Sequence, residues 1–496
     1  MCQSFPSRSL FISFFLLILQ LPSRPATAQA PQQICPAQFG DRVAAIVSRP
    51  EFARLRWGIL IQTQSFSQPP TTLAAHDAER YFIPASNAKL LTTAAALTQL
   101  GSRFRIRTSI YQVDTTASGV VLTIVGRGDP SLTDAELRQL AQQLSDRGIT
   151  TIDQLIADDR YIRGETTNPT WEWEDIQAGY GAPASSFILN QNRINLTLVP
   201  QAIGQPLRVE WETPTEQQGW RIDNQTQTVD ATAPEFLQVG RDLSRPVLMV
   251  RGQLRVDADP EPVGIAVTQP TQNFLERFRQ VLTAQQIRVN RVGLVESLRR
   301  RITPTTLPAN FPEVAAVESP PLATLISVAN QRSNNIYAEA ILRSLGATNP
   351  DTTSNLEAGI AAMNMTLTQL NVTPNSYRLV DGSGLSRHDL VSPVVLVQTL
   401  QAMTRSPYAT VFRDSLAIAG ESGTLRNSFR NTPIQGRLRG KTGSLNGVTT
   451  LSGYFAPAHY SPLVFSILVN QAHTAIDDAT QAIDEILLLM AQLQDC

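Results

Sequence analysis

Apolar residues recur along the two ends of the chain with the spacings of helices and of buried strands. An apolar series from Ser86 to Leu100 follows a helical period and stops before Gly101, and a second series runs from Ile476 to Leu493. The mostly apolar runs at residues 57–61 and 463–469, and the β-branched and aromatic run at 448–455, are typical of strands. The two ends of the chain therefore predict helices packed on one buried sheet.

The middle of the chain has a different pattern. Residues 105–113 and 120–125 predict two strands around a turn. Thr133-Asp134-Ala135-Glu136 is a capping box, which predicts a helix that ends near Gly148, and residues 271–284 predict another helix. Residues 196–257 are rich in Thr, Gln, Val and Pro and predict a small, mostly β insertion.

The N-terminus predicts a secretory signal peptide. Arg8 precedes an apolar run from Leu10 to Leu21, and Ala26-Thr27-Ala28 provides a small-residue cleavage site. No later apolar run reaches the length of a spanning helix, so we expect a periplasmic protein with no stable membrane anchor. A formal net charge of −1 and short arginine clusters argue against nucleic acid as a partner.

Three cysteines are present, and removal of a signal peptide would leave only Cys35 and Cys496, near the two ends. In an oxidising compartment we expect this pair to form a disulfide, with two free thiols as the alternative. The four histidines show neither metal-ligand spacing nor a candidate Ser-His-Asp grouping. The sequence therefore implies no metal and no cofactor.

Lysine is used at only two positions, Lys89 and Lys441, although Lys and Arg together number 41. Arginine holds charge on a surface but cannot lose its proton in a protein, whereas a lysine amine can act as a base. Both lysines lie in short motifs, Ser86-x-x-Lys89 and Lys441-Thr442-Gly443. Ser86-x-x-Lys89 alone is a weak signal because the pattern recurs by chance in many proteins, although on the predicted helix positions i and i+3 share a face, so the two side chains can meet.

A third motif, Ser333-x-Asn335, lies between the other two. The trio in this order resembles penicillin-binding proteins and serine β-lactamases. The long segment between Lys89 and Ser333 is similar to that of the class C low-molecular-mass penicillin-binding proteins, of the D-alanyl-D-alanine carboxypeptidase/endopeptidase type. Further stretches that match this family are residues 129–132, 171–175, 381–388 and 441–445.

The resemblance implies an α+β fold. We expect a transpeptidase/β-lactamase-like domain, an antiparallel sheet with helices, that carries two inserted smaller domains. The expected division is a signal peptide at 1–28, a catalytic domain at 29–104 and 316–496, an inserted α/β domain at 105–196 and 258–315, and the small mostly β insertion at 197–257.

The residue types of the trio predict a serine acyl-enzyme. Ser86 is the expected nucleophile and neutral Lys89 its base, with Lys441 supplying a second positive charge that depresses the Lys89 pKa. Ser333 would relay a proton to the leaving amine, and Asn335 would bind the substrate peptide. We expect peptidoglycan stem peptides as substrates and β-lactams as covalent inhibitors.

Further substrate contacts are expected around this centre. Lys441, Thr442 and Ser444 would hold the terminal carboxylate, and Gly443 would let the substrate backbone approach the strand. The backbone N–H groups of Ser86 and Ser444 would form the oxyanion hole.

The resemblance also implies a pocket for a diaminopimelate amine at Asp175 and Tyr180. It further implies a substrate contact at Asn446, where some relatives have Gln. Asn334 departs from the Asp of many relatives, and we expect little effect because it lies between the two functional positions. Two alternatives stay open: a β-lactamase-like hydrolase, and a non-catalytic peptidoglycan-binding protein.

Overall fold

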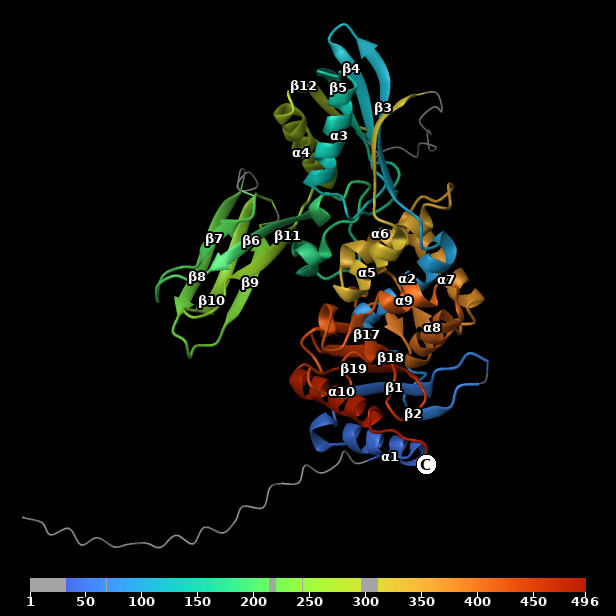
Figure 1. The fold of residues 1–496 in the computed structure, drawn as a ribbon. Helices are drawn as coiled ribbons and strands as arrows, with labels where there is room; N and C mark the ends of the chain where they lie inside the picture. Colours follow the sequence, from blue (N-terminus) through green and yellow to red (C-terminus); the bar gives the residue numbers. More distant parts are fainter. Residues whose placement is uncertain (1–32, 68, 214–219, 243, 296–310) are drawn as a thin grey trace, which may run out of the picture.

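The computed structural model describes residues 33–67, 69–213, 220–242, 244–295 and 311–496 (Figure 1). The predicted signal peptide lies outside the described residues. The chain forms a helix-and-sheet body from its two ends, with two further β-containing parts built from its middle (Figure 1). This arrangement confirms the predicted α+β fold class.

A six-stranded antiparallel sheet forms the centre of the body. Strand β1 pairs with β19 with Arg56 opposite Asn470, so the beginning and the end of the chain meet inside one sheet. The strand order is β16 (Ala417–Ile418), β17 (Leu438–Leu445), β18 (Val448–Phe455), β19 (Leu463–Asn470), β1 (Arg56–Thr63) and β2 (Thr72–His76).

Helices cover both faces of this sheet, which explains why its central strands are buried along almost their whole length. Leu60 faces one core, while its neighbours Ile59 and Ile61 face the other. The first core is closed by α2 (Ala88–Leu100), α5 (Leu322–Gln331), α6 (Asn335–Gly346), α7 (Asn355–Gln369), α8 (Pro393–Arg405) and α9 (Ala409–Asp414). The second is closed by α1 (Pro36–Val47) and α10 (Ile476–Met490). A two-stranded ribbon, β14 (Tyr377–Arg378) and β15 (Leu390–Val391), completes the body.

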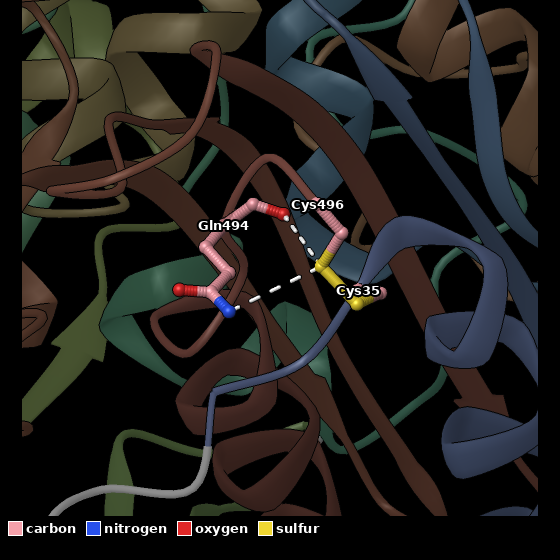
Figure 2. The surroundings of a disulfide bond; sticks show 3 residues. All are labelled: Cys35, Gln494 and Cys496. Atoms are coloured by element: carbon pink, nitrogen blue, oxygen red, sulfur yellow. Dashed lines mark hydrogen bonds between the residues drawn. A yellow bond between two sulfur atoms is a disulfide. The ribbon is translucent and has the colours of Figure 1, made fainter.

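The two ends of the chain are joined covalently. Cys35 and Cys496 form a disulfide, with Gln494 beside it (Figure 2). Ile34 also bridges Leu493 in a short parallel pairing. The predicted disulfide is therefore confirmed, and it ties α1 to the end of the chain that follows α10.

A five-stranded mixed sheet lies above the body (Figure 1). The predicted capping box is present, since Thr133 and Glu136 cap each other at the start of a helix. Two helices, α3 (Asp134–Asp146) and α4 (Pro270–Ala284), pack on the sheet with a common apolar core. The strand order is β12 (Arg288–Leu294), β5 (Thr151–Asp158), β4 (Gly119–Val125), β3 (Arg107–Thr116) and β13 (Glu313–Glu318).

Two three-stranded sheets enclose a separate small core and project to one side (Figure 1). Their orders are β8 (Arg221–Val229), β10 (Val247–Arg255), β9 (Phe236–Arg241) and β11 (Glu261–Ala266), β6 (Arg193–Val199), β7 (Arg208–Trp211). The small β insertion was expected at 197–257, but β6 begins before this range and β11 lies after it. Strand β13 crosses residue 316, where the second part of the catalytic domain was expected to begin. We call the two parts built from residues 105–318 the insertion; its division into two domains stays a proposal.

Candidate active site

Ser86 lies in a 3-10 turn, Ala85–Asn87, that leads directly into α2. Ala85 has a left-handed backbone with φ of 48°, which a non-glycine residue adopts only when its surroundings hold it there. A Cβ at Gly443 would lie 2.9 Å from the Ser86 nitrogen. It would also overlap the Thr450 hydroxyl, so glycine is required here by the close packing of Thr450 and of the serine turn on β17, while the approach of a substrate backbone stays a prediction.

The Lys89 amine is the centre of the site. Its Nζ donates hydrogen bonds to Ser86 Oγ at 2.9 Å, Asn335 Oδ1 at 2.7 Å and the Ser383 carbonyl oxygen at 2.6 Å. The side chain is fully buried, and loss of solvent lowers the pKa of Lys89 to about 7. A lysine that is half neutral near pH 7 can accept a proton from the adjacent serine.

Lys441, on β17, forms the second half of the site. Its Nζ donates to Ser333 Oγ at 2.9 Å and to the Thr442 carbonyl oxygen at 2.7 Å. Burial lowers the pKa of Lys441 well below its usual range, and the positive charge of Lys89 lowers it further. Burial is thus the largest cause of the low Lys89 pKa, and because repulsion between two ammonium groups is mutual, the expected contribution of Lys441 stays a prediction.

Ser333 and Asn335 stand on either side of Asn334 at the start of α6. Ser333 has a left-handed backbone with φ of 55°. Asn335 accepts from Lys89 and donates through Nδ2 to the Tyr180 carbonyl oxygen at 3.0 Å. The three motifs thus meet through the two lysines, and Asn335 joins them to the insertion.

A buried acidic cluster behind Lys89 was not singled out from the sequence. It consists of Asp381, Glu339 and Asp389, whose negative charges all raise the Lys89 pKa and so oppose the larger effect of burial. Asp381 accepts four hydrogen bonds, from the backbone N–H groups of Ser383, Gly384 and Ser386 and from the Trp171 indole. The only sequence signal was the glycine-rich stretch that contains Asp381.

Glu339 links this cluster to α6. One carboxylate oxygen accepts from the Gly382 N–H at 2.8 Å, and the other accepts from Arg343 at 2.6 Å, in a fully buried ion pair. The loop that presents the Ser383 carbonyl to Lys89 is therefore fixed from below by Glu339. The opposite charges of the pair and the Gly382 N–H stabilise the Glu339 carboxylate inside the protein.

Asp175 and Tyr180 lie where the insertion meets the body. The Tyr180 hydroxyl hydrogen-bonds to the Asp175 carboxylate, and burial raises the pKa of Asp175. Trp173 is 47% exposed and Tyr180 is 53% exposed, while Trp171 is buried against Asp381. The predicted acidic and aromatic groups are therefore adjacent, although only Trp173 and Tyr180 present aromatic surface to solvent.

The remaining predicted residues lie along β17 and the turn after it. The Thr442 hydroxyl donates to that of Thr424 at 2.7 Å, and Ser444 is exposed on the same strand. Asn446 lies in the turn between β17 and β18, where its carbonyl accepts from Arg387 and its side chain lies 3.2 Å from His473 Nδ1. No hydrogen bond joins Asn446 to the three motifs within the part of the chain that the structure describes.

Comparison with known proteins adds independent findings. The sequence pattern of the D-Ala-D-Ala carboxypeptidase 3 (S13) family matches residues 40–492. A D-alanyl-D-alanine carboxypeptidase of Actinomadura sp. (strain R39) is 30% identical over 82% of this chain and 77% of its own. A penicillin-sensitive carboxypeptidase A of Dictyostelium discoideum is 26% identical over 88% of this chain and 87% of its own.

Among solved structures, penicillin binding protein 4 from Haemophilus influenzae superposes with a TM-score of 0.75. The superposition covers 91% of this chain and 97% of that one, at 21% sequence identity. At this identity the likeness establishes a shared fold.

Proposed function

Because the chain belongs to the D-Ala-D-Ala carboxypeptidase 3 (S13) family, we propose that it is a penicillin-sensitive serine D-alanyl-D-alanine carboxypeptidase and endopeptidase. Its substrates would be peptidoglycan stem peptides and their cross-links. The observation that carries this proposal is the buried Lys89 amine 2.9 Å from the Ser86 hydroxyl.

The first half of the reaction forms an acyl-enzyme. Ser86 Oγ attacks the carbonyl carbon of the penultimate D-Ala, and its proton passes to neutral Lys89 Nζ. The developing oxyanion accepts hydrogen bonds from the backbone N–H groups of Ser86 and Ser444, whose placement next to each other is favoured by the packing of the serine turn on Gly443.

The peptide bond breaks when the leaving D-Ala nitrogen receives a proton. Ser333 would relay this proton: its hydroxyl, held 2.9 Å from Lys441 Nζ, gives a proton to the leaving nitrogen and is reprotonated by the proton that Lys89 took from Ser86, so both lysines end the step as they began it. Lys441, Thr442 and Ser444 would hold the terminal carboxylate of the substrate. Water then attacks the acyl carbon and gives a proton to neutral Lys89; the bond from the acyl carbon to Ser86 Oγ breaks, and Lys89 returns that proton to Ser86 Oγ.

Asp175 and Tyr180 would bind the free amino end of a diaminopimelate side chain. The buried Asp175 carboxylate beside the exposed Tyr180 ring supplies the charge and the partial desolvation that an ammonium group requires. Asn446 would contact substrate from the β17–β18 turn. The proposed location is the periplasm; within the described residues no helix is long and apolar enough to cross a membrane.

Fluorescent penicillin tests the proposal. We expect stoichiometric labelling that maps to the peptide containing Ser86 and disappears in Ser86→Ala, together with release of D-Ala from a pentapeptide. Rapid turnover of penicillin without a lasting adduct would favour the β-lactamase-like alternative. Absence of both labelling and D-Ala release from folded protein would favour the non-catalytic alternative.

A further inference from the structure

Three consecutive residues of the insertion adopt a left-handed backbone. Asn190, Gln191 and Asn192 have φ values of 48°, 61° and 50°. Residues other than glycine adopt this region at a cost that is lower for asparagine, and they normally occur in it singly. A run of three persists only where the surrounding structure holds it in place.

Buried hydrogen bonds hold this turn. Asn192 is fully buried, donates through Nδ2 to the carbonyl oxygens of Pro183 at 2.8 Å and Phe187 at 3.0 Å, and accepts from the Leu189 N–H. On the other side, the Asn190 N–H donates to the Leu132 carbonyl oxygen at 2.9 Å. The two asparagines anchor the turn in the insertion and leave the middle residue to point away.

The middle residue contacts the catalytic body. Gln191 Oε1 accepts a hydrogen bond from Asn334 Nδ2 at 2.7 Å. The orientation of the Asn334 amide is fixed independently, because its Oδ1 caps α6 by accepting from the Tyr337 N–H at 3.3 Å. Asn334 is therefore held from both sides, by its own helix and by the insertion.

Asn334 is the middle residue of the second motif. Its neighbours Ser333 and Asn335 contact Lys441 and Lys89 respectively. Ser333 is itself strained, with φ of 55°, so its hydroxyl position depends on restraint from adjacent residues. The structure thus gives position 334 two contacts that the expectation of little effect did not consider.

We propose that Gln191 is a positioning residue for acyl transfer, acting through Asn334 on Ser333 and Asn335. The inference rests on the proposed function. The strained turn of the insertion holds Gln191 so that the second motif is correctly placed only when the insertion is docked on the body. The side chains of residues 334 and 191 then form a hydrogen-bonded pair in which one must donate and the other must accept.

Exchange of amide for carboxylate tests this pairing. In Gln191→Glu the new carboxylate still accepts from Asn334, and in Asn334→Asp the Gln191 amide can rotate to donate while the other Asp oxygen still caps α6. The double variant places two carboxylates together with no donor between them. We expect both single variants within about threefold of wild type and the double variant at least about tenfold slower in the first-order acylation constant for penicillin.

Gln280→Glu combined with Asn334→Asp is the matched control, since Gln280 is exposed on α4 and adds the same charge elsewhere on the insertion. It should acylate like Asn334→Asp alone. Gln191→Met removes the oxygen that accepts from Asn334 without adding charge, and it takes the place of the double variant if the double variant does not fold. Its acylation constant should also fall at least about tenfold. Melting temperatures establish that each variant is folded.

The idea is overturned if the folded Gln191→Glu/Asn334→Asp variant acylates at the rate given by the product of the single effects, or if Gln191→Met acylates like wild type. Failure of the proposed function would look different, because wild-type protein would then not be acylated at all.

Discussion

Acylation of Ser86 should depend steeply on pH across the neutral range. Only neutral Lys89 can accept the serine proton, and burial lowers the pKa of Lys89 to about 7. The neutral fraction is then roughly one in eleven at pH 6 and roughly ten in eleven at pH 8. We therefore expect the acylation rate to rise about tenfold between these two pH values and to level off above them.

The sign of this dependence follows from the cause of the shift. Burial disfavours the charged form of Lys89, while Asp381, Glu339 and Asp389 favour it and keep the pKa from falling further. Acylation is thus lost as the pH falls through the pKa of folded Lys89. A lysine with its ordinary pKa would instead leave the rate climbing well above pH 8.

The assay is the first-order acylation constant at saturating fluorescent penicillin, measured from about pH 5.5 to about pH 9. Lys89→Arg is the control variant, because a guanidinium has no neutral form in this range; its residual acylation should be slow and independent of pH. A flat wild-type profile, or near-normal acylation by Lys89→Arg, would refute the assignment of Lys89 as the base.

Three further predictions concern the surroundings of the site. Gly443→Ala should lower acylation at least about tenfold, because its Cβ would displace the Ser86 N–H; unchanged labelling would argue against the close packing of the turn. Asp175→Ala should weaken hydrolysis of a D-Ala-D-Ala peptide with a free diaminopimelate amine yet leave penicillin acylation near normal; equal losses on an N-acetylated control peptide would mean that Asp175 is structural. The Cys35–Cys496 bond spans a sequence separation of 461, so its reduction should lower the free energy of unfolding by up to about 6 kcal/mol in denaturant titrations. An unchanged midpoint would show that the pairing of Ile34 with Leu493 holds the two ends together without the disulfide.

Local features of the site could be predicted from the sequence because they depend on short-range physics. The helical period after Ser86 fixes that Ser86 and Lys89 share a face, and Gly101 fixes where the helix ends. The restriction of lysine to two positions identified the groups able to lose a proton. The paired terminal cysteines likewise follow from composition and compartment, and the disulfide is present.

Contacts between distant segments were decided only by tertiary packing. Lys89 meets Asn335 across 246 positions of sequence, and Lys441 meets Ser333 across 108. No period or propensity specifies such distances, so the order of the motifs indicated their chemistry only through the family they resemble. The acidic cluster around Asp381 was missed for the same reason.

The most specific features come from the way the insertion is seated on the body. Asn334 appeared to be a neutral departure from the family pattern, yet its amide joins α6 to Gln191. Gly443 was predicted to let the substrate backbone approach the strand, and only packing shows that a side chain there would also meet Thr450 and the serine turn. The sequence predicts which face of its helix or strand a residue occupies. Which residue it contacts on that face depends on tertiary packing, because only the folded chain determines which buried polar groups form hydrogen bonds with one another.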